Sequence, residues 1–302
     1  MRWMLRLGLL AGLAWGVRRL GSLLSTPPEP TTTDALVAGG RFVEADGIRL
    51  HFEERGSGPP VIFIHGLLGS ADVWAGLAAR LDPHFTTFAL DLPGAGLSDK
   101  PAVRDYGTTA QARAVTAFAE NECDGPAWLV ATSAGARVAL SAMSRRPDLF
   151  AGAALLAPVL EASPRGISED WALCIANLTT AALRSRRLVG VALRTAAGPG
   201  MQVDRTLLDA FMIPARTEGF AAALAASLTT GNHLDREELP APVGKPGLII
   251  RGLNDRIAPA AVAEQLRMET GAELHLLPGC GHFPQSERSD EVARLFRDFV
   301  AR

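Results

Sequence analysis

The feature that most constrains the fold is a repeated alternation of short apolar runs with longer segments of helical periodicity, from residue 41 to residue 302. Strands that are buried on both faces of a parallel sheet read as such short apolar runs. Strands that alternate with helices predict βαβ units, so we expect an α/β fold with a doubly wound, mostly parallel sheet. The runs are Val61–Ile64, Phe85–Leu90, Trp128–Ala131, Ala151–Leu156, Leu248–Arg251 and Leu274–Leu277. The helical segments are Ala71–Arg80, Thr108–Asn121, Ala134–Ser144, Ala260–Met268 and Asp290–Ala301.

Two segments depart from this alternation. Ile48–Glu53 alternates apolar and polar residues, which predicts a strand with one solvated face. Residues 159–240 are rich in alanine and leucine, have helical periodicity throughout and contain no strand pattern. An all-helical segment between two strands is expected to cover the carboxyl edge of the sheet, where such folds bind ligands. We therefore predict a core of residues 41–158 and 241–302, with an inserted helical cap at 159–240.

Residues 1–24 form a separate unit, in which the uncharged apolar run Leu7–Val17 has arginines on both sides. Arg18 and Arg19 stand where a cleaved secretory signal would need small residues. The uninterrupted run is also shorter than the roughly 20 residues that span a bilayer. We predict that this segment associates with a membrane, with the arginines reaching the headgroups. The alternative is a helix packed on the rest of a cytoplasmic protein. Residues 25–40 contain three prolines and no apolar period, which predicts a linker.

The charge balance and the cysteines argue against several classes of function. The formal net charge is −2, whereas a nucleic-acid partner requires a clustered basic surface, so none is expected. The three cysteines, Cys123, Cys174 and Cys280, are widely spaced and match neither a disulfide framework nor paired zinc ligands. Cys280 stands two residues before His282, a spacing that directs the two side chains away from a shared substrate. We therefore expect Cys280 to be structural.

Ser133 lies between a predicted buried strand and a predicted helix. This is the setting of a nucleophile elbow, a turn so tight that the residues beside the serine must be small. Such a turn exposes the hydroxyl at the start of a helix, where N–H groups and the helix dipole favour a developing negative charge. A serine that only caps a helix is common in the same place. The segment by itself leaves both interpretations open.

The loop after the Val61–Ile64 run supplies a second candidate element. An acyl-transfer site needs two N–H donors directed at the tetrahedral oxygen. Ala134, directly after the serine, provides one N–H, and Leu67 is the best candidate for the other because Gly66 lets the backbone turn inward. His65, at the start of the loop, is expected to make structural hydrogen bonds rather than to act as a catalytic base.

Asp255 and His282 each follow one of the last two predicted strands. A carboxylate in such a turn can accept the imidazole N–H of a histidine and fix its tautomer. A histidine in a loop rich in glycine and proline can reach the serine as a general base. Taken singly, the aspartate could be a turn residue and the histidine simply exposed. The order serine, acid, histidine, with each residue after a strand, favours a catalytic triad of Ser133, Asp255 and His282.

These motifs resemble those of the α/β-hydrolase superfamily over nearly all of residues 41–302. The shared motifs are HG-x-x-G at His65, D-x-P-G-x-G-x-S at Asp91–Ser98, S-x-G at Ser133, G-x-x-D-x-x-x-P at Gly252–Pro259 and G-H-F-P at Gly281–Pro284. The resemblance implies the triad and the oxyanion N–H groups named above, a cap at 159–240, and a structural role for the Asp91–Ser98 loop. Ala131 and Ala136 stand where glycine is usual, which can tighten the elbow without removing its function. The serine excludes the branches with an aspartate nucleophile, the haloalkane dehalogenases and epoxide hydrolases.

The predicted activity is hydrolysis of a carboxylic ester, small or lipid-like, by two-step acyl transfer to water. Neither a metal nor an organic cofactor is implied. Apolar cap residues and the predicted membrane segment favour a lipid-like substrate, although apolar residues at helical spacing often pack only on one another. The same triad serves carbon–carbon bond hydrolases and cofactor-free perhydrolases, which are the alternatives. The fold also serves non-catalytic binding proteins, which usually lose a triad member.

Overall fold

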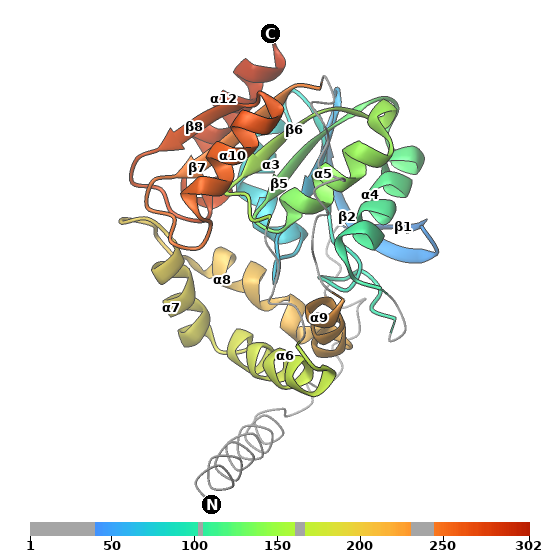
Figure 1. Cartoon of the computed structure of the whole chain (residues 1–302), viewed down its shortest axis with the longest axis vertical. Coiled ribbons are helices and arrows are strands. Elements are labelled where there is room, and N and C mark those ends of the chain that lie inside the picture. The colour runs from blue at the N-terminus through green and yellow to red at the C-terminus, as the bar shows by residue number, and fades with distance from the viewer. Residues whose placement is uncertain (1–39, 102–104, 161–166, 231–244) are drawn as a thin grey trace, which may run out of the picture.

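The computed structural model describes residues 40–101, 105–160, 167–230 and 245–302, which build a central sheet of eight strands in the order β1-β2-β4-β3-β5-β6-β7-β8 (Figure 1). All neighbouring strands from β4 to β8 pair in parallel, whereas β2 pairs antiparallel with β1 and β4. This confirms the predicted doubly wound, mostly parallel sheet. The strands are β1 (Arg41–Ala45), β2 (Ile48–Gly56), β3 (Pro60–Ile64), β4 (Thr86–Leu90), β5 (Ala127–Thr132), β6 (Phe150–Leu156), β7 (Gly247–Gly252) and β8 (Glu273–Leu277).

β1 is an addition to the predicted sheet. It pairs with β2 through the two-residue turn Asp46-Gly47, in which both residues have positive φ, 52° and 69°. A two-residue hairpin turn of this kind requires positive φ at both central positions, and Asp-Gly is among its preferred sequences. The Asp-Gly pair directly before Ile48 is therefore the signal that predicts β1.

Helices cover both faces of the sheet, as a doubly wound fold requires. Alanine-rich helices pack with the sheet into one apolar core cluster, and a second cluster on the opposite face includes Trp74 and Phe296. The helices of the first face are α4 (Thr108–Glu122), α5 (Gly135–Arg145) and α10 (Ala260–Thr270). Those of the second are the 3-10 helix η1 (Ala71–Trp74), α3 (Ala75–Leu81) and α12 (Ser289–Val300). Two short elements, η2 (Pro147–Leu149) and α11 (Pro284–Glu287), connect strands and helices.

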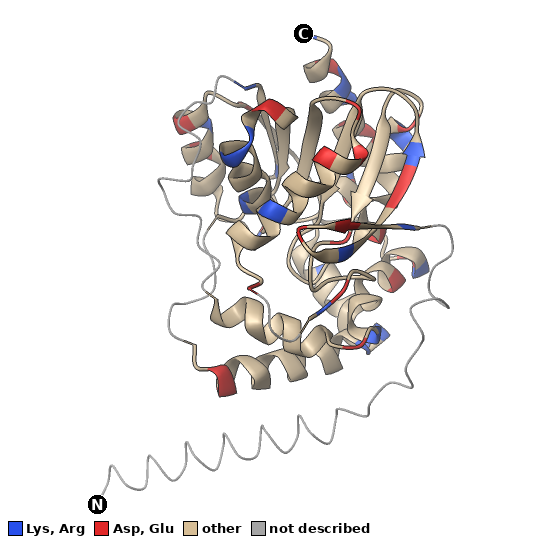
Figure 2. Ribbon diagram, turned by 90° about the vertical axis from the view of Figure 1, so that its right-hand side faces the viewer, with Lys and Arg blue, Asp and Glu red and all other residues tan. Residues whose placement is uncertain are grey.

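Between β6 and β7 the described residues 167–230 contain only helices, which we call the helical insertion. They lie together below the sheet in Figures 1 and 2, and their charged residues gather towards the helix ends. The elements are α6 (Glu169–Leu183), α7 (Arg186–Ala196), α8 (Arg205–Met212), the 3-10 helix η3 (Pro214–Arg216) and α9 (Phe220–Thr229). α6 and α9 share a small apolar cluster that includes Ala172, Ala176 and Phe220. The insertion therefore has an apolar cluster of its own, against which Leu68 of the loop after β3 also packs.

Several predicted boundaries stay predictions. The cap limit 159 lies just before residues 161–166 and the limit 240 lies within residues 231–244, and both of these ranges are outside the described residues. The predicted membrane-associated segment, 1–24, and nearly all of the predicted linker, 25–40, lie outside them as well. Within the part of the chain that the structure describes, no helix combines the length and apolarity needed to cross a membrane.

A buried polar cluster holds the loop that follows β3. One carboxylate oxygen of Asp91 accepts the N–H of Ala71 at 2.7 Å, and the other accepts the N–H of Leu97 and lies 2.8 Å from His51 Nδ1. Gly96 has φ of +47°, and a Cβ there would lie within 2.1 Å of this carboxylate. The Asp91–Ser98 loop therefore closes around a single anion, which ties β4 to the start of η1.

His65 belongs to the same cluster and makes structural hydrogen bonds, as expected. Its Nε2 accepts the N–H of Leu92 at 3.1 Å, so its proton is on Nδ1, which donates to the carbonyl of Gly66 at 2.8 Å. Burial lowers the pKa of His65, although Asp91 and the Gly66 carbonyl act in the opposite direction. Burial by itself would raise the pKa of Asp91, but the hydrogen bond and charge of His51 outweigh it and hold that pKa low.

We predict that acidification through the range in which an unfolded histidine titrates destabilises the protein through His65. Because the pKa of His65 is lowered in the folded state, the unfolded state binds more protons below about pH 6.5, and stability falls as the pH falls. Thermal unfolding between pH 7.5 and pH 5.5 measures this. His65→Gln should be less stable at pH 7.5 but lose less of its melting temperature across the range, since it lacks the imidazole whose pKa burial lowers. An equal loss in both proteins would contradict this role.

Candidate active site

Ser133 occupies a strained turn between β5 and α5. Its φ is +53°, in the left-handed region that residues with a side chain rarely adopt, at a cost of about 1–3 kcal/mol. The N–H of Ser133 donates to the carbonyl of Leu156 at 2.9 Å, and its own carbonyl accepts the N–H of Val159 at 3.1 Å. Both partners belong to the end of β6 and the loop after it. The neighbouring strand therefore holds the backbone of Ser133 in this conformation.

The residues around Ser133 are small because other backbone passes close by. A Cβ on Gly135 would lie 2.5 Å from the carbonyl oxygen of His65, and one on Gly66 would lie 2.9 Å from Ser133 Cβ. Ala131 and Ala136, the two departures from the usual motif, are fully buried within the core around this turn. The methyl groups fit at these two positions, whereas Gly135 and Gly66 have no room for one.

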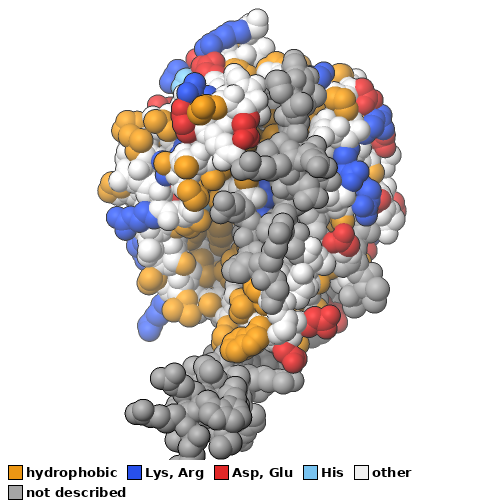
Figure 3. All heavy atoms as spheres, viewed as in Figure 1, with side chains coloured by type: hydrophobic (Ala, Val, Ile, Leu, Met, Phe, Trp, Pro, Cys, Tyr) orange, Lys and Arg blue, Asp and Glu red, His pale blue; other side chains and the backbone are white. Residues whose placement is uncertain are grey.

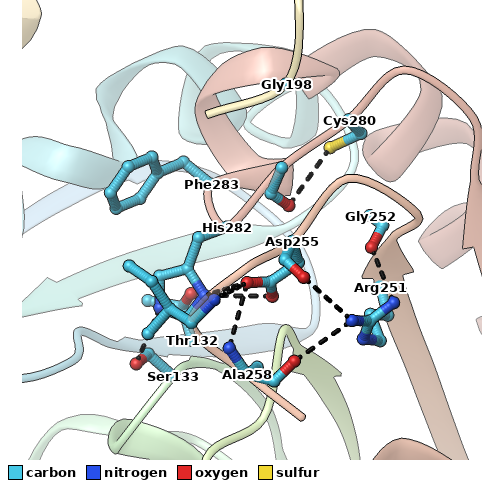
Figure 4. Close-up of polar contacts among 12 residues, drawn as sticks. Thr132, Ser133, Gly198, Arg251, Gly252, Asp255, Ala258, Cys280, His282 and Phe283 are labelled. Atoms are coloured by element: carbon cyan, nitrogen blue, oxygen red, sulfur yellow. Dashed lines mark hydrogen bonds and ion pairs between the residues drawn. The ribbon is translucent and has the colours of Figure 1, made fainter. Parts of the chain in front are cut away.

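Ser133, His282 and Asp255 form one chain of hydrogen bonds (Figure 4). His282 Nε2 lies 3.0 Å from Ser133 Oγ, and His282 Nδ1 lies 3.0 and 3.1 Å from the two carboxylate oxygens of Asp255. The three residues follow β5, β8 and β7, whose carboxyl ends meet at one edge of the sheet. His282 and Asp255 are buried, and Ser133 is partly exposed to the cavity described below.

The surroundings of Asp255 keep its carboxylate ionised. One of its oxygens also accepts the N–H groups of Ile257 at 2.8 Å and Ala258 at 3.0 Å. Burial by itself would raise the pKa of Asp255, but the hydrogen bond and charge of His282 and these two N–H donors outweigh it, so the pKa is lowered. An ionised Asp255 accepts the Nδ1 proton of His282. Nε2 is then left as an acceptor for the Ser133 hydroxyl.

Arg251 supports the Asp255 turn, a role absent from the sequence-based prediction. Its guanidinium is buried and donates to the carbonyls of Gly252 at 2.9 Å, Asp255 at 3.1 Å and Ala258 at 3.1 Å (Figure 4). A planar guanidinium can hold several carbonyls of one turn at once. The sequence does carry a signal for this role, which is an arginine at the end of an otherwise apolar strand. A charged side chain buried in this position must find acceptors nearby.

The two expected oxyanion donors are the N–H groups of Leu67 and Ala134. Leu67 lies in the loop after β3 and Ala134 directly precedes α5, and both line the cavity that contains Ser133. No hydrogen bond within the described part of the chain occupies the N–H of Leu67 or of Ala134. Two N–H groups beside one cavity, without acceptors among the described residues, are available to an oxyanion, and their role as its donors stays a prediction.

A cavity of about 400 Å³ opens over Ser133, a size within the range of small-molecule sites. It lies between the sheet edge and the helical insertion, and Figure 3 shows a hollow with hydrophobic side chains on its walls in this part of the molecule. Most of its lining is apolar, and the insertion contributes Leu183, Val189, Ala192, Leu193, Ala196, Phe211 and Leu228. The wall also includes Arg137, a buried guanidinium whose pKa burial lowers to about 10.

Cys280 does not share this site. Its thiol is buried and contacts the carbonyl of Gly281 at 3.7 Å, and burial raises its pKa to about 12. A neutral thiol is a poor nucleophile, which agrees with the expected structural role. Among the described residues no cluster of three or more histidine, cysteine or acidic side chains has the geometry to hold a metal ion.

Comparisons with known proteins agree with this geometry. Residues 61–295 match the model of the alpha/beta hydrolase family. The chain is 29% identical to a 2-(acetamidomethylene)succinate hydrolase of Mesorhizobium japonicum, over 86% of this chain and 94% of that protein. It is 30% identical to the lipase LipV of Mycobacterium tuberculosis, over 83% of this chain and 97% of that protein. The crystal structure of a bacterial membrane phospholipase A superimposes with a TM-score of 0.69 at 25% identity, over 99% of this chain and 98% of that one. The chain therefore belongs to the alpha/beta hydrolase family and is a hydrolase.

Proposed function

We propose that this hydrolase cleaves carboxylic esters through an acyl-enzyme, with Ser133 as nucleophile, His282 as general base and Asp255 as the residue that orients His282. The observation that carries the proposal is the unbroken hydrogen-bond chain from Ser133 to Asp255 at the floor of an apolar cavity. A nucleophile, a base and an orienting acid within hydrogen-bond reach are the combination that acyl transfer requires.

The reaction proceeds in two halves. In the first, Ser133 Oγ bonds to the carbonyl carbon of the ester while its proton moves to His282 Nε2. The N–H groups of Leu67 and Ala134 hold the resulting oxyanion. The bond from carbon to the leaving oxygen then breaks, and the alcohol takes the proton from Nε2. In the second half, a water molecule gives its proton to His282, attacks the acyl-enzyme and releases the acid, and the proton returns to Ser133.

The cavity favours an ester with an extended apolar part. The helical insertion lines the cavity with leucine, valine, alanine and phenylalanine side chains. Burial of an acyl or alkyl chain against them removes apolar surface from water and is therefore favourable. A volume of about 400 Å³ leaves room for a substrate much larger than an acetyl ester. The similarity to a lipase also favours a lipid-like ester.

A second candidate, hydrolysis of a carbon–carbon bond beside a carbonyl, draws on Arg137. A guanidinium in the cavity wall can hold the carboxylate that many acidic substrates carry. The apolar side chains form the larger part of the wall, so esters remain the first proposal. Parallel assays with para-nitrophenyl esters and with a β-diketone acid separate the two functions. Only the β-diketone acid carries a carboxylate for Arg137 to hold.

We also propose that residues 1–24 attach the enzyme to a membrane. The support is the apolar run between arginines and the similarity to a membrane phospholipase A along the whole chain. We predict that the full chain sediments with membranes and stays there in high salt, since salt does not screen apolar burial. A chain without residues 1–24 should stay in the supernatant. Recovery of the full chain in the soluble fraction would disprove the anchor.

We predict that Ser133→Ala lowers ester turnover by at least about 10⁴-fold, because the variant lacks the hydroxyl that forms the proposed acyl-enzyme. The variant should also lose covalent labelling by a fluorophosphonate probe, while its circular dichroism spectrum is unchanged. Ser144→Ala is the matched control, since Ser144 is an exposed serine on α5, the helix that follows Ser133, and its loss should leave both activities unchanged. Labelling that persists in Ser133→Ala would identify another nucleophile.

We predict that Ala192→Phe shortens the acyl chain that the enzyme accepts. Ala192 lies on α7 at the cavity wall, so a phenyl ring there should lower kcat/KM for a decanoyl ester by about 10-fold and leave an acetyl ester almost unchanged. Val191→Phe is the control, because Val191 is 60% exposed and is not part of the cavity lining. If both variants affect both esters alike, the long chain does not occupy this cavity.

A further inference from the structure

The carboxylate of Glu287 accepts three backbone N–H groups from two distant parts of the chain. Its Oε1 accepts the N–H of Phe283 at 3.0 Å, and its Oε2 accepts those of Gly281 and Gly198, both at 2.8 Å. Gly281 and Phe283 stand on either side of His282. Gly198 lies 89 residues away from Glu287, in the helical insertion directly after α7. One side chain therefore joins the histidine loop to the insertion.

Capping of a helix accounts for only one of these bonds. Glu287 ends the short helix α11, and Phe283 precedes that helix, so the bond from Oε1 satisfies an N–H at its start. The two bonds to Oε2 go to residues outside α11. An ionised carboxylate only accepts hydrogen bonds and has lone pairs for all three donors. The Glu287 carboxylate therefore binds the two loops as well as the start of its own helix.

The two loops that Glu287 joins are in direct backbone contact. The N–H of His282 itself donates to the carbonyl of Ala196 at 3.0 Å. A Cβ on Gly281 would lie 2.4 Å from the backbone nitrogen of Gly198, and one on Gly198 would lie 2.2 Å from the carbonyl oxygen of Gly279. The position of the histidine backbone is thus set against the end of α7. The N–H groups at this contact are removed from water and need an acceptor.

α7 is also a wall of the cavity, through Val189, Ala192, Leu193 and Ala196. We propose that Glu287 is a positioning residue, which holds the base His282 in line with Ser133 and couples that alignment to the cavity wall formed by α7. This inference rests on the proposed function of the triad. A displacement of about 1 Å in a reacting group can cost about 100-fold in rate, and loss of an outer hydrogen-bonding partner typically costs about 10- to 100-fold.

The test compares Glu287→Gln and Glu287→Asp with wild type in the full-length enzyme. Glutamine is the same size, but it replaces one acceptor oxygen by an NH₂ donor that opposes the N–H groups of the loops. We expect kcat to fall about 10- to 100-fold in Glu287→Gln, with KM changed less than threefold. Glu287→Asp retains the charge and should retain more of kcat. Glu291→Gln is the matched control: it removes a nearby acidic charge on α12 and should leave kcat unchanged.

Two further readouts separate positioning from a general loss of structure and from failure of the proposed function. The rate of fluorophosphonate labelling at Ser133 should fall in parallel with kcat, at a temperature where all variants are folded by circular dichroism. The low-field proton resonance of the hydrogen bond between His282 and Asp255 should broaden in Glu287→Gln, whether or not an ester is turned over. Equal kcat in Glu287→Gln and Glu291→Gln, or an unchanged resonance, would overturn the inference. Absence of ester turnover in wild type, with the resonance still altered by Glu287→Gln, would overturn only the proposed substrate.

Discussion

The close approach of the end of β3 to the start of α5 is the constraint on which the site depends. Gly135 and Gly66 lie at this contact, where an added methyl group would overlap backbone or Ser133 itself. The contact brings the loop after β3 against the Ser133 turn, so that Leu67, Ser133 and Ala134 line one cavity. The strain of a left-handed serine persists because the end of β6 holds its backbone on the other side.

Beneath this contact, buried polar groups hold the backbone of the site's loops in place, in addition to the apolar side chains of these loops that pack in the core. Asp91 ties the loop after β4 to the start of η1, Arg251 closes the turn that carries Asp255, and Glu287 binds the loop that carries His282. In each case one buried or partly buried charge meets several backbone groups. Charge-assisted hydrogen bonds to several backbone groups add a strong restraint to these loops. Each of the three ionic groups serves a different loop at the same edge of the sheet.

The helical insertion contributes in two ways. It provides about half of the apolar side chains around the cavity over Ser133, and it contacts the histidine loop through Gly198 and Ala196. A further attachment is the hydrogen bond from Ser70 to the carbonyl of Ala210, which joins the loop after β3 to α8. The insertion thus contacts both the side of the site that carries the oxyanion donors and the side that carries the base. A change in the insertion can therefore alter binding and chemistry together.

The sequence by itself determined the sheet, most of the helix positions and the order of the three candidate triad residues, because periodicity and glycine-rich turns are local properties of the chain. These local patterns predicted the Ser133 turn, the Asp255 turn and the His282 loop. β1 was readable too, from Asp46-Gly47. Only the tertiary structure decided the roles of Arg251 and Glu287, because their partners are backbone groups that have no sequence signature, and Gly198 is 89 residues distant from Glu287. The cavity likewise exists only where the insertion meets the sheet edge, since the same apolar residues of α7 could equally have packed on one another.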